Sequence, residues 1–409
     1  MEKEETFRVP YGKDFLRLRI ESREREIFHP SFLPPIPRIE ETLLETLNNP
    51  RGVSPLKNLL KGRKEICIVV DDNTRPPTAR LTLPVLLPYL RNAGVKKVTL
   101  LIALGLHKPL SEDKKRELLG PIPSWVEVVN HSPEDTEEAG EINGIKIKIN
   151  RIFLKSPFRM VIGDVEFHQI FGYGGGAKSL LPGIADTESI TYIHSLLVHP
   201  DARPGNIENN PVQKFLKKLY SLVRVDFSLQ YVLNTEEKPI KLFGGTLEDT
   251  FFQGIKWVDS LYKLKIERSL DTLVVSPGGF PRDIDLYQTQ KVLTMTGEAV
   301  KKGGKIFIFS ECSDGPGPEE FVKWMNRGMK KEEIEQKVKE RFSMGLHKLY
   351  LFLRGIQNKE VYLYSSLSPE MVKKVFLKPV KLEEISSLIK KGERVGFVPY
   401  GTITLLERV

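Results

Sequence analysis

A glycine-rich stretch that ends in a lysine and a serine stands out among the residues that could carry chemistry. Residues 172–183 read GYGGGAKSLLPG, which comes within one residue of the phosphate-binding pattern GxxxxGK[ST]. Two features speak against such a loop: Ala177 replaces the glycine before Lys178, and Pro182 interrupts the helix that a phosphate loop should open. The glycines still allow positive φ angles and the close approach of a ligand. Lys178 could therefore pair with an anion or bond covalently to a carbonyl-type group.

Histidines surround this lysine in the sequence. His168 lies ten residues before Lys178, His194 lies sixteen residues after it, and His107 follows an earlier apolar segment. Imidazoles exchange protons near pH 7, and neutral ones bind nickel, zinc or copper. No HExxH motif or carboxylate-rich ligand set accompanies them, so a zinc site built from side chains alone is not favoured. Proton transfer and metal binding both stay open as roles for the histidines.

The elements that must position these residues follow a strand–helix alternation. Short apolar runs predict strands at 65–72, 96–105 and 159–167. Between the first two strands, the pattern predicts a helix over 78–95, and a second helix should begin after Ser111, a residue suited to cap its start. This alternation is typical of a parallel sheet covered on both faces, in which ligands bind beyond the carboxyl ends of the strands. The loops 71–78 and 106–111 should therefore face a shared crevice.

A second strand–helix unit begins near residue 270. Residues 271–281 predict a strand and a loop, 283–302 a helix and 303–312 another strand. We therefore predict an α/β fold with two domains, 1–268 and 269–409, each with a mostly parallel sheet flanked by helices. The proline-rich segment 26–40 should be irregular.

Composition narrows the class of protein. Hydrophobic residues form 40% and charged residues 28% of the 409-residue chain, and the net charge of +9 is dispersed among mixed-sign segments such as 330–342. Cys67 and Cys312 are far apart, which favours a reducing compartment over a disulfide framework. The start MEKEETFRVPYGK lacks the apolar core of a secretory signal. We expect a cytoplasmic protein without a membrane or nucleic-acid partner.

Several motifs, taken in order, resemble those of the nickel-dependent lactate racemase family. They are DDNTRPPT, LGLHKP, FHQIFGYGGGAKSLLPG, YIHSLL, DIDLYQTQK and ECSDG, which together span roughly residues 65 to 315. The resemblance implies a racemase or epimerase of a 2-hydroxy acid. It also implies hydride transfer to and from a nickel pincer cofactor, pyridinium-3,5-bisthiocarboxylic acid mononucleotide.

The resemblance assigns residues to this cofactor. Lys178 would tether it covalently and His194 would bind nickel, with further contacts from Asp71, Asp72, Gly174, Gly175 and Gly176. Proteins of cofactor synthesis would then be partners during maturation.

Other residues would act on the substrate. By the same resemblance His107 and His168 are the alternating acid and base, and Arg75 holds the substrate carboxylate. An arginine suits that task because its planar fork binds two oxygens at once. Further substrate contacts would come from the second domain, across an interdomain cleft: Tyr287, Gln288 and Lys291.

One departure from the family pattern concerns the substrate. Lactate-specific members place a tryptophan late in the second domain, whereas the last tryptophan here is Trp324. The acid could therefore be larger or more polar than lactate. Two alternatives remain open from the sequence: a nucleotide- or NAD-dependent α/β enzyme, and a non-catalytic protein that binds the nickel cofactor.

Overall fold

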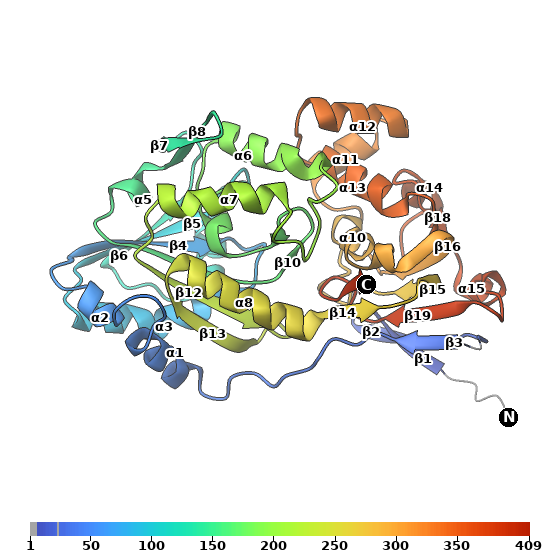
Figure 1. The fold of residues 1–409 in the computed structure, drawn as a ribbon, viewed down its shortest axis with the longest axis horizontal. Coiled ribbons are helices and arrows are strands. Elements are labelled where there is room, and N and C mark those ends of the chain that lie inside the picture. The colour runs from blue at the N-terminus through green and yellow to red at the C-terminus, as the bar shows by residue number, and fades with distance from the viewer. Residues whose placement is uncertain (1–5, 23) are drawn as a thin grey trace. The chain divides into compact units, whose positions relative to one another are not determined.

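The computed structural model describes residues 6–22 and 24–409, and the chain forms two compact units (Figure 1). We call them unit A, residues 32–202 and 206–260, and unit B, which contains the chain up to Ser31, residues 203–205 and residues 261–409. Residues 1–5, the start of the segment without the apolar core of a secretory signal, lie outside the described residues.

Unit A contains a sheet of six strands in the order β13-β12-β9-β4-β5-β6. Its strands are β4 (Glu65–Asp71), β5 (Lys97–Ala103), β6 (Val126–Asn130), β9 (Arg159–Asp164), β12 (Phe227–Leu233) and β13 (Pro239–Gly245). All neighbouring strands are parallel except the pair β12 and β13. The continuous apolar run of β4 matches this central place, because a central parallel strand is buried on both faces.

Helices cover the sheet of unit A. Helices α1 (Ile39–Asn48), α3 (Thr78–Asn92) and α4 (Glu112–Leu119) share one hydrophobic core with alternate residues of the strands. Helix α3 continues through Pro84 and Pro88, and α4 begins after Ser111, whose side chain accepts a hydrogen bond from the Lys114 backbone as predicted. The remaining α-helices of this part of the chain are α2 (Leu56–Leu59), α5 (Arg151–Lys155), α6 (Thr187–Ser195), α7 (Pro211–Leu222) and α8 (Leu247–Tyr262). A hairpin of β7 (Thr136–Ile142) and β8 (Ile145–Asn150) lies outside the main sheet.

Unit B contains a second six-stranded sheet, in the order β18-β17-β16-β15-β19-β3, and all its neighbours are parallel. Its strands are β3 (Glu24–Ile27), β15 (Leu270–Val275), β16 (Val300–Phe309), β17 (Glu360–Tyr364), β18 (Lys378–Pro379) and β19 (Arg394–Val398). Smaller pairs are β1 (Thr6–Tyr11) with β2 (Asp14–Arg19), and β14 (Lys263–Ile266) with β20 (Leu405–Arg408). Its α-helices are α9 (Leu286–Thr289), α10 (Lys291–Thr296), α11 (Glu319–Met325), α12 (Lys331–Glu340), α13 (Leu346–Ile356), α14 (Pro369–Lys373) and α15 (Leu382–Leu388).

The two units do not coincide with the predicted division into 1–268 and 269–409: the chain up to Ser31 and residues 203–205 belong to unit B, whose C-terminal segment begins at Leu261. Strand β3 pairs with β19, with Glu24 opposite Arg394, so the first strands of the chain join the C-terminal sheet. The β1–β2 hairpin packs Phe7, Val9 and Leu18 into the core of that same sheet. This pairing links residues about 370 positions apart, and no local pattern in the sequence signals such a contact.

The predicted helix 283–302 was too long. The structure forms the short helices α9 and α10 followed by a 3-10 turn (Gly297–Ala299), and residues from Val300 onward already belong to β16. Asp285 begins α9 because its carboxylate accepts a hydrogen bond of 2.6 Å from the Gln288 backbone.

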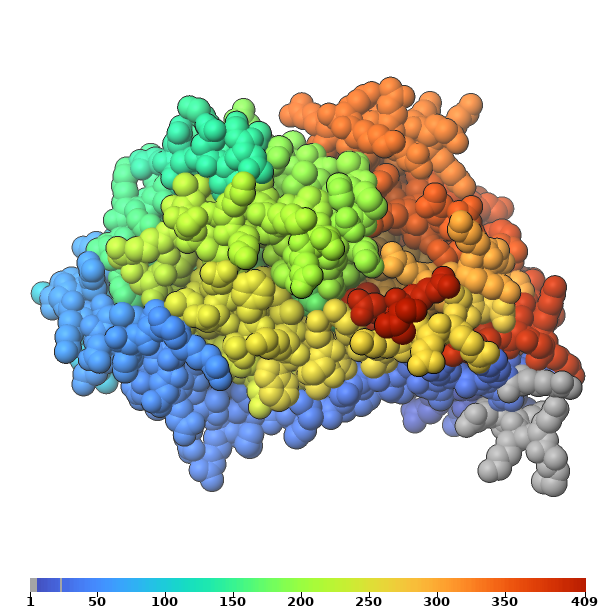
Figure 2. Space-filling model, viewed as in Figure 1, coloured from blue at the N-terminus to red at the C-terminus, as the bar shows by residue number. Residues whose placement is uncertain are grey.

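The mixed-charge segment near residue 330 is a surface helix. Figure 2 shows the orange segment that contains α12 on the surface. Ile334 and Val338 are the buried residues of this helix. Across residues 6–22 and 24–409, no helix has both the length and the apolar character to span a bilayer.

Candidate active site

The site residues predicted for the first domain follow the central strands of unit A. The chain runs from β4 outward to β5 and β6, then returns to β9 on the other side of β4 and continues outward to β12, so the strand order reverses between β4 and β9. Such a switch point opens a crevice at the carboxyl ends of the strands, where ligands bind in sheets of this kind. Asp71 and Asp72 end β4, His107 follows β5, and Glu166 and His168 follow β9.

His107 and Asp72 form a hydrogen-bonded pair. The His107 Nδ1 lies 2.6 Å from one Asp72 carboxylate oxygen, and the other oxygen accepts a 2.6 Å bond from the Thr74 hydroxyl. Burial would raise the pKa of Asp72, but the bonds from His107 and Thr74 outweigh it and the pKa lies below its usual value. An ionised Asp72 keeps the proton of neutral His107 on Nδ1, so that Nε2 carries the lone pair. The imidazole is 46% exposed, which leaves it accessible to a substrate.

Hydrogen bonds hold His168 in the opposite tautomer to that of His107. It lies in a small hairpin of β10 (Phe167–His168) and β11 (Gly172–Tyr173), and its Nδ1 accepts hydrogen bonds from the backbone N–H groups of Ile170 (3.3 Å) and Phe171 (3.1 Å). The neutral ring therefore carries its proton on Nε2. The structure thus holds His107 with a lone pair on Nε2 and His168 with a hydrogen on Nε2, a complementary base and donor.

His194 lies on α6 and is held by its own helix. Its Nδ1 donates a 2.8 Å hydrogen bond to the Ile190 carbonyl, so Nε2 is the basic nitrogen. Burial lowers the pKa of His194 to about 4, and the charges of Lys178 and His107 act in the same direction. The imidazole is neutral at pH 7, which is the form that binds metals. The ring of Phe171 lies between the two histidines, with its centroid 4.7 Å from that of His168 and 5.2 Å from that of His194.

Lys178 lies in a single 3-10 turn, Gly176–Ser179, which contacts β4 and β9. A phosphate loop would open an α-helix at this point, so the structure agrees with the rejection of that motif. Burial and the positive charge of Arg75 lower the pKa of Lys178 to about 8, although Asp71 and Glu166 oppose the shift. A sizeable fraction of the amine is consequently neutral and nucleophilic near pH 7 to 8.

The glycines before Lys178 serve the packing of the loop itself. Gly175 and Gly176 have φ angles of +87° and +58°, which side chains rarely adopt. A Cβ at Gly176 would lie 2.7 Å from the Phe251 ring and 2.8 Å from the Tyr220 hydroxyl. The Gly176 N–H also donates to Gln230 at 3.3 Å. These backbone angles and contacts explain why glycine occupies positions 175 and 176 without reference to a ligand. That Gly174, Gly175 and Gly176 contact a cofactor stays a prediction.

Arg75 pairs with a carboxylate that the sequence analysis did not single out. Its Nη1 contacts Oε1 of Glu166, and these side chains are 23% and 37% exposed. Burial would lower the pKa of Arg75, but Glu166, Asp164 and Asp71 raise it, so the guanidinium stays charged. The position of Glu166, two residues before His168 at the end of a predicted strand, was the available signal.

Two buried aspartates complete the charge balance around Lys178. Burial raises the pKa of Asp71 to about 6, although Lys178 and Arg75 pull it down. Burial also raises the pKa of Asp164, and the negative charges of Glu166 and Asp71 act in the same direction. Asp164 ends β9 in the same way that Asp71 ends β4, a parallel that the sequence contains but that was not used.

The predicted substrate residues of the C-terminal domain lie in unit B. Tyr287 and Gln288 are on α9, and Lys291 begins α10, all after central strand β15. The Tyr287 hydroxyl lies 3.5 Å from His347 Nε2, and the buried amine of Lys348 lies 4.4 Å from the centre of the Tyr287 ring. His347 and Lys348 therefore join the predicted substrate residues of unit B. The approach of this group to the residues of unit A stays a prediction.

The donors present fit a metal cofactor that brings its own ligands. Within residues 6–22 and 24–409, no group of three or more His, Cys, Asp or Glu side chains could hold a metal ion. His194 nevertheless offers one oriented, neutral nitrogen, and the charge of Lys178 acts on its pKa. One nitrogen ligand and one reactive amine suit a metal complex that brings its other ligands and is held by a covalent tether.

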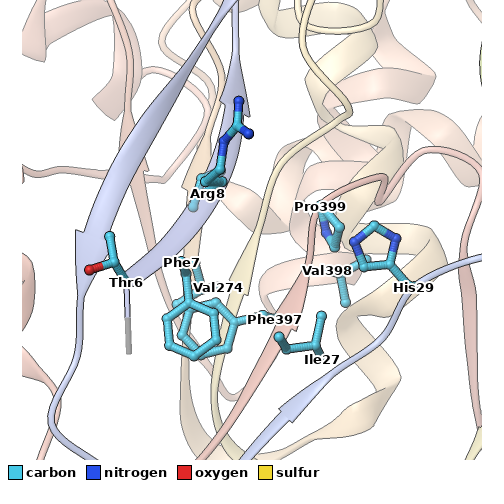
Figure 3. Close-up of a pocket in the computed structure, with 10 residues that line it drawn as sticks. Thr6, Phe7, Arg8, Ile27, His29, Val274, Phe397, Val398 and Pro399 are labelled. Carbon is cyan, nitrogen blue, oxygen red and sulfur yellow. The ribbon is translucent and has the colours of Figure 1, made fainter. Parts of the chain in front are cut away.

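A separate cavity of about 200 Å³ lies in unit B and is drawn in Figure 3. The stacked rings of Phe7 and Phe397, with centroids 3.5 Å apart, form part of its wall, and His29 and Pro399 line it as well. None of the predicted site residues lines this cavity, so it does not belong to the candidate active site.

The lowered pKa of Lys178 leads to a prediction about how its chemical modification depends on pH. Acetylation of the cofactor-free protein should modify Lys178 increasingly as the pH rises through about 8, because the amine loses its proton there. An ordinary lysine, with a pKa of about 10.4, is almost fully protonated at pH 8. Quantitative peptide mass spectrometry, with a lysine model peptide as the reference, measures both profiles. A Lys178 profile that matches the peptide would contradict the described environment.

The two parallel sheets and the titratable groups at the switch point of unit A define an α/β enzyme. Comparison with known proteins narrows this class. Residues 11–205 match the lactate racemase N-terminal domain, and residues 266–395 match the lactate racemase C-terminal domain.

Individual relatives agree with these matches. The chain is 29% identical over 385 residues to the lactate racemase of Thermoanaerobacterium thermosaccharolyticum, which covers 90% of each chain. It is 30% identical over 290 residues to the lactate racemase of Lactiplantibacillus plantarum, which covers 69% of this chain and 68% of that one. The lactate racemase apoprotein structure from T. thermosaccharolyticum superposes with a TM-score of 0.88 at 28% identity, over 98% of this chain and all of that chain. A Thermotoga maritima structure shares the fold, with a TM-score of 0.68 at 19% identity over 93% of this chain and all of that chain.

The chain belongs to the lactate racemase family. It is a racemase and hence an isomerase, as the resemblance in the sequence predicted.

Proposed function

We propose that this protein racemises or epimerises a 2-hydroxy acid with a nickel pincer nucleotide cofactor, and that lactate is the first substrate to test. The observation that carries the proposal is the gathering of two oriented histidines, an arginine and a reactive lysine at one switch point. Family membership supports the reaction class, and the names of the relatives support lactate.

Two residues of unit A would hold the cofactor. The neutral amine of Lys178 would attach it covalently, and Nε2 of His194 would bind nickel. The bound group supplies an acceptor for hydride, which no side chain can provide. Its delivery requires cofactor-synthesis proteins as partners during maturation.

The side chains of the protein would bind the carboxylate of the substrate and accept the proton of its hydroxyl group. Arg75 binds the carboxylate through its planar fork. Nε2 of His107 takes the hydroxyl proton as the α-hydrogen leaves, and the negative charge of Asp72 stabilises the imidazolium that forms. His168 would serve the opposite enantiomer, because a racemase needs an acid–base group for each face of the planar keto acid. To accept a proton at Nε2, its ring would first move its own proton to Nδ1 and give up the bonds from Ile170 and Phe171. Tyr287, Gln288 and Lys291 would add substrate contacts from unit B.

The direct test uses protein produced together with the cofactor-synthesis proteins. Single enantiomers of lactate and of larger or more polar 2-hydroxy acids are incubated with it, and chiral chromatography follows the opposite enantiomer or epimer. Formation of that product identifies the substrate. Protein that carries the cofactor but converts no acid of the panel would refute the catalytic proposal and favour a cofactor-binding protein.

The Asp72–His107 pair leads to a prediction about catalysis. Asp72→Asn should lower kcat by about 10- to 100-fold, because the amide can neither fix the His107 tautomer nor stabilise its cation. Bound cofactor, measured by intact mass, should not change. Loss of the cofactor with unchanged kcat per loaded site would instead support the cofactor-binding role that the resemblance implied for Asp72.

A further inference from the structure

We infer that Glu166 is a positioning residue that orients Arg75 for the substrate carboxylate. The inference rests on the proposed function for its consequence in catalysis. Its structural basis is the contact between Oε1 of Glu166 and Nη1 of Arg75 in a partly buried setting.

Glu166 connects Arg75 with two other parts of the site. Its backbone carbonyl accepts a 2.8 Å hydrogen bond from the Gly174 N–H, in the loop that leads to Lys178. A Cβ at Gly174 would lie 3.3 Å from Cγ of Glu166, so the glycine lets the loop pack against this side chain. Glu166 also lies two residues before His168. One residue thus fixes Arg75 relative to the glycine loop and to a histidine of the site.

Arg75 needs such a partner because other carboxylates compete for it. Asp164, Asp71 and Asp72 all act on its charge, and Glu166 has the largest effect of the four. A long guanidinium side chain would otherwise adopt several orientations among these acids. When Nη1 of Arg75 contacts Glu166, the other edge of the guanidinium, formed by Nε and Nη2, can bind the substrate. The spacing of these two nitrogens matches the two oxygens of a carboxylate.

The kinetic test compares Glu166→Ala and Glu166→Gln with the wild type, all loaded with cofactor. KM for the 2-hydroxy acid should rise about 10- to 100-fold in the alanine variant, the effect of losing a hydrogen bond to a charged group. The kcat should change less than about threefold, because Arg75 binds the carboxylate equally in ground and transition states. Glutamine, which keeps the acceptor oxygen, should restore part of the loss. Glu138→Gln, which removes an exposed pair with Lys146 in a distant part of the sequence, is the matched control and should leave KM unchanged.

A double variant tests whether Glu166 acts through Arg75. In an Arg75→Ala background, Glu166→Ala should cause no further rise in KM, since the group that it orients is gone. Losses that multiply would show an independent role and overturn the inference.

A measurement on cofactor-free protein separates this inference from the proposed function. In protein labelled with ¹⁵N-arginine, the side-chain Nε–H resonance of Arg75, assigned with Arg75→Lys, should shift and lose order in Glu166→Ala. It should stay in place in Glu138→Gln. An unchanged Arg75 resonance would refute the positioning role whether or not the wild type turns over. A shifted resonance in a protein that converts no acid would instead leave the role intact and refute the proposed function.

Discussion

Replacing Lys178 by alanine is expected to remove the covalent cofactor and to lower racemisation by at least about 10³-fold, because the reaction then lacks its hydride acceptor. The structure gives the reason for choosing this lysine: burial and Arg75 lower its pKa to about 8, so its amine is nucleophilic near neutral pH. Intact mass spectrometry of protein produced with the cofactor-synthesis proteins measures the adduct, and chiral chromatography measures the activity.

Two control variants make this result specific. Lys178→Arg keeps the positive charge beside Asp71 but offers no amine of lowered pKa, so it should lose the adduct while unfolding at nearly the wild-type temperature. Lys146→Ala removes an exposed lysine that pairs with Glu138, and it should keep both adduct and activity. An adduct that persists in Lys178→Ala would place the attachment elsewhere and refute the assignment.

Replacing His107 or His168 by asparagine is expected to lower racemisation by about 10²- to 10⁴-fold, the usual contribution of general acid–base catalysis. Each variant should keep its cofactor, because Lys178 and His194 hold it in the proposed arrangement. Chiral chromatography under steady-state conditions measures the loss.

The two histidine variants should differ in a single turnover. Each histidine serves one enantiomer, so a variant should still form keto acid from the enantiomer handled by the remaining histidine. Rapid-quench measurement with each enantiomer reveals the pattern. Equal loss with both enantiomers in both variants would show that the histidines act as one unit and would refute separate roles. His131→Asn is an unsuitable control because that buried ring bonds to Asn150 and Ala185, whereas the exposed His199 is suitable.

Local patterns predicted much of unit A correctly. The strands at β4, β5 and β9 and the cap at Ser111 appear where the sequence placed them, because continuous apolar runs and capping residues are local signals. The hydrogen bond between Asp72 and His107 shows that the loops after β4 and β5 lie together, as expected if they share a crevice. Parallel strands bring their carboxyl ends to one edge, and this rule needs no knowledge of tertiary contacts.

Other features were beyond the reach of local patterns. The 283–302 segment was predicted as one helix, yet its last three residues belong to β16, where Val300 pairs with Leu270 of β15. Asp72 was assigned to the cofactor by the resemblance, and that role stays a prediction; the hydrogen bond of its carboxylate with His107 is an additional contact that the sequence did not indicate. Glu166 was missed because its partner Arg75 lies 91 positions earlier in the chain.

Local patterns in the sequence established where β4, β5 and β9 form, which segments after them carry His107, His168 and Lys178, and which family these motifs resemble. These properties depend on residue types at short spacing, which a linear chain displays directly. The tertiary structure alone decided that the first strands join the C-terminal sheet, which nitrogen of each histidine is basic, and which carboxylate holds Arg75. Such features depend on contacts between residues far apart in the chain, and on burial that shifts the balance between charged and neutral forms. Neither can be read from neighbouring residues.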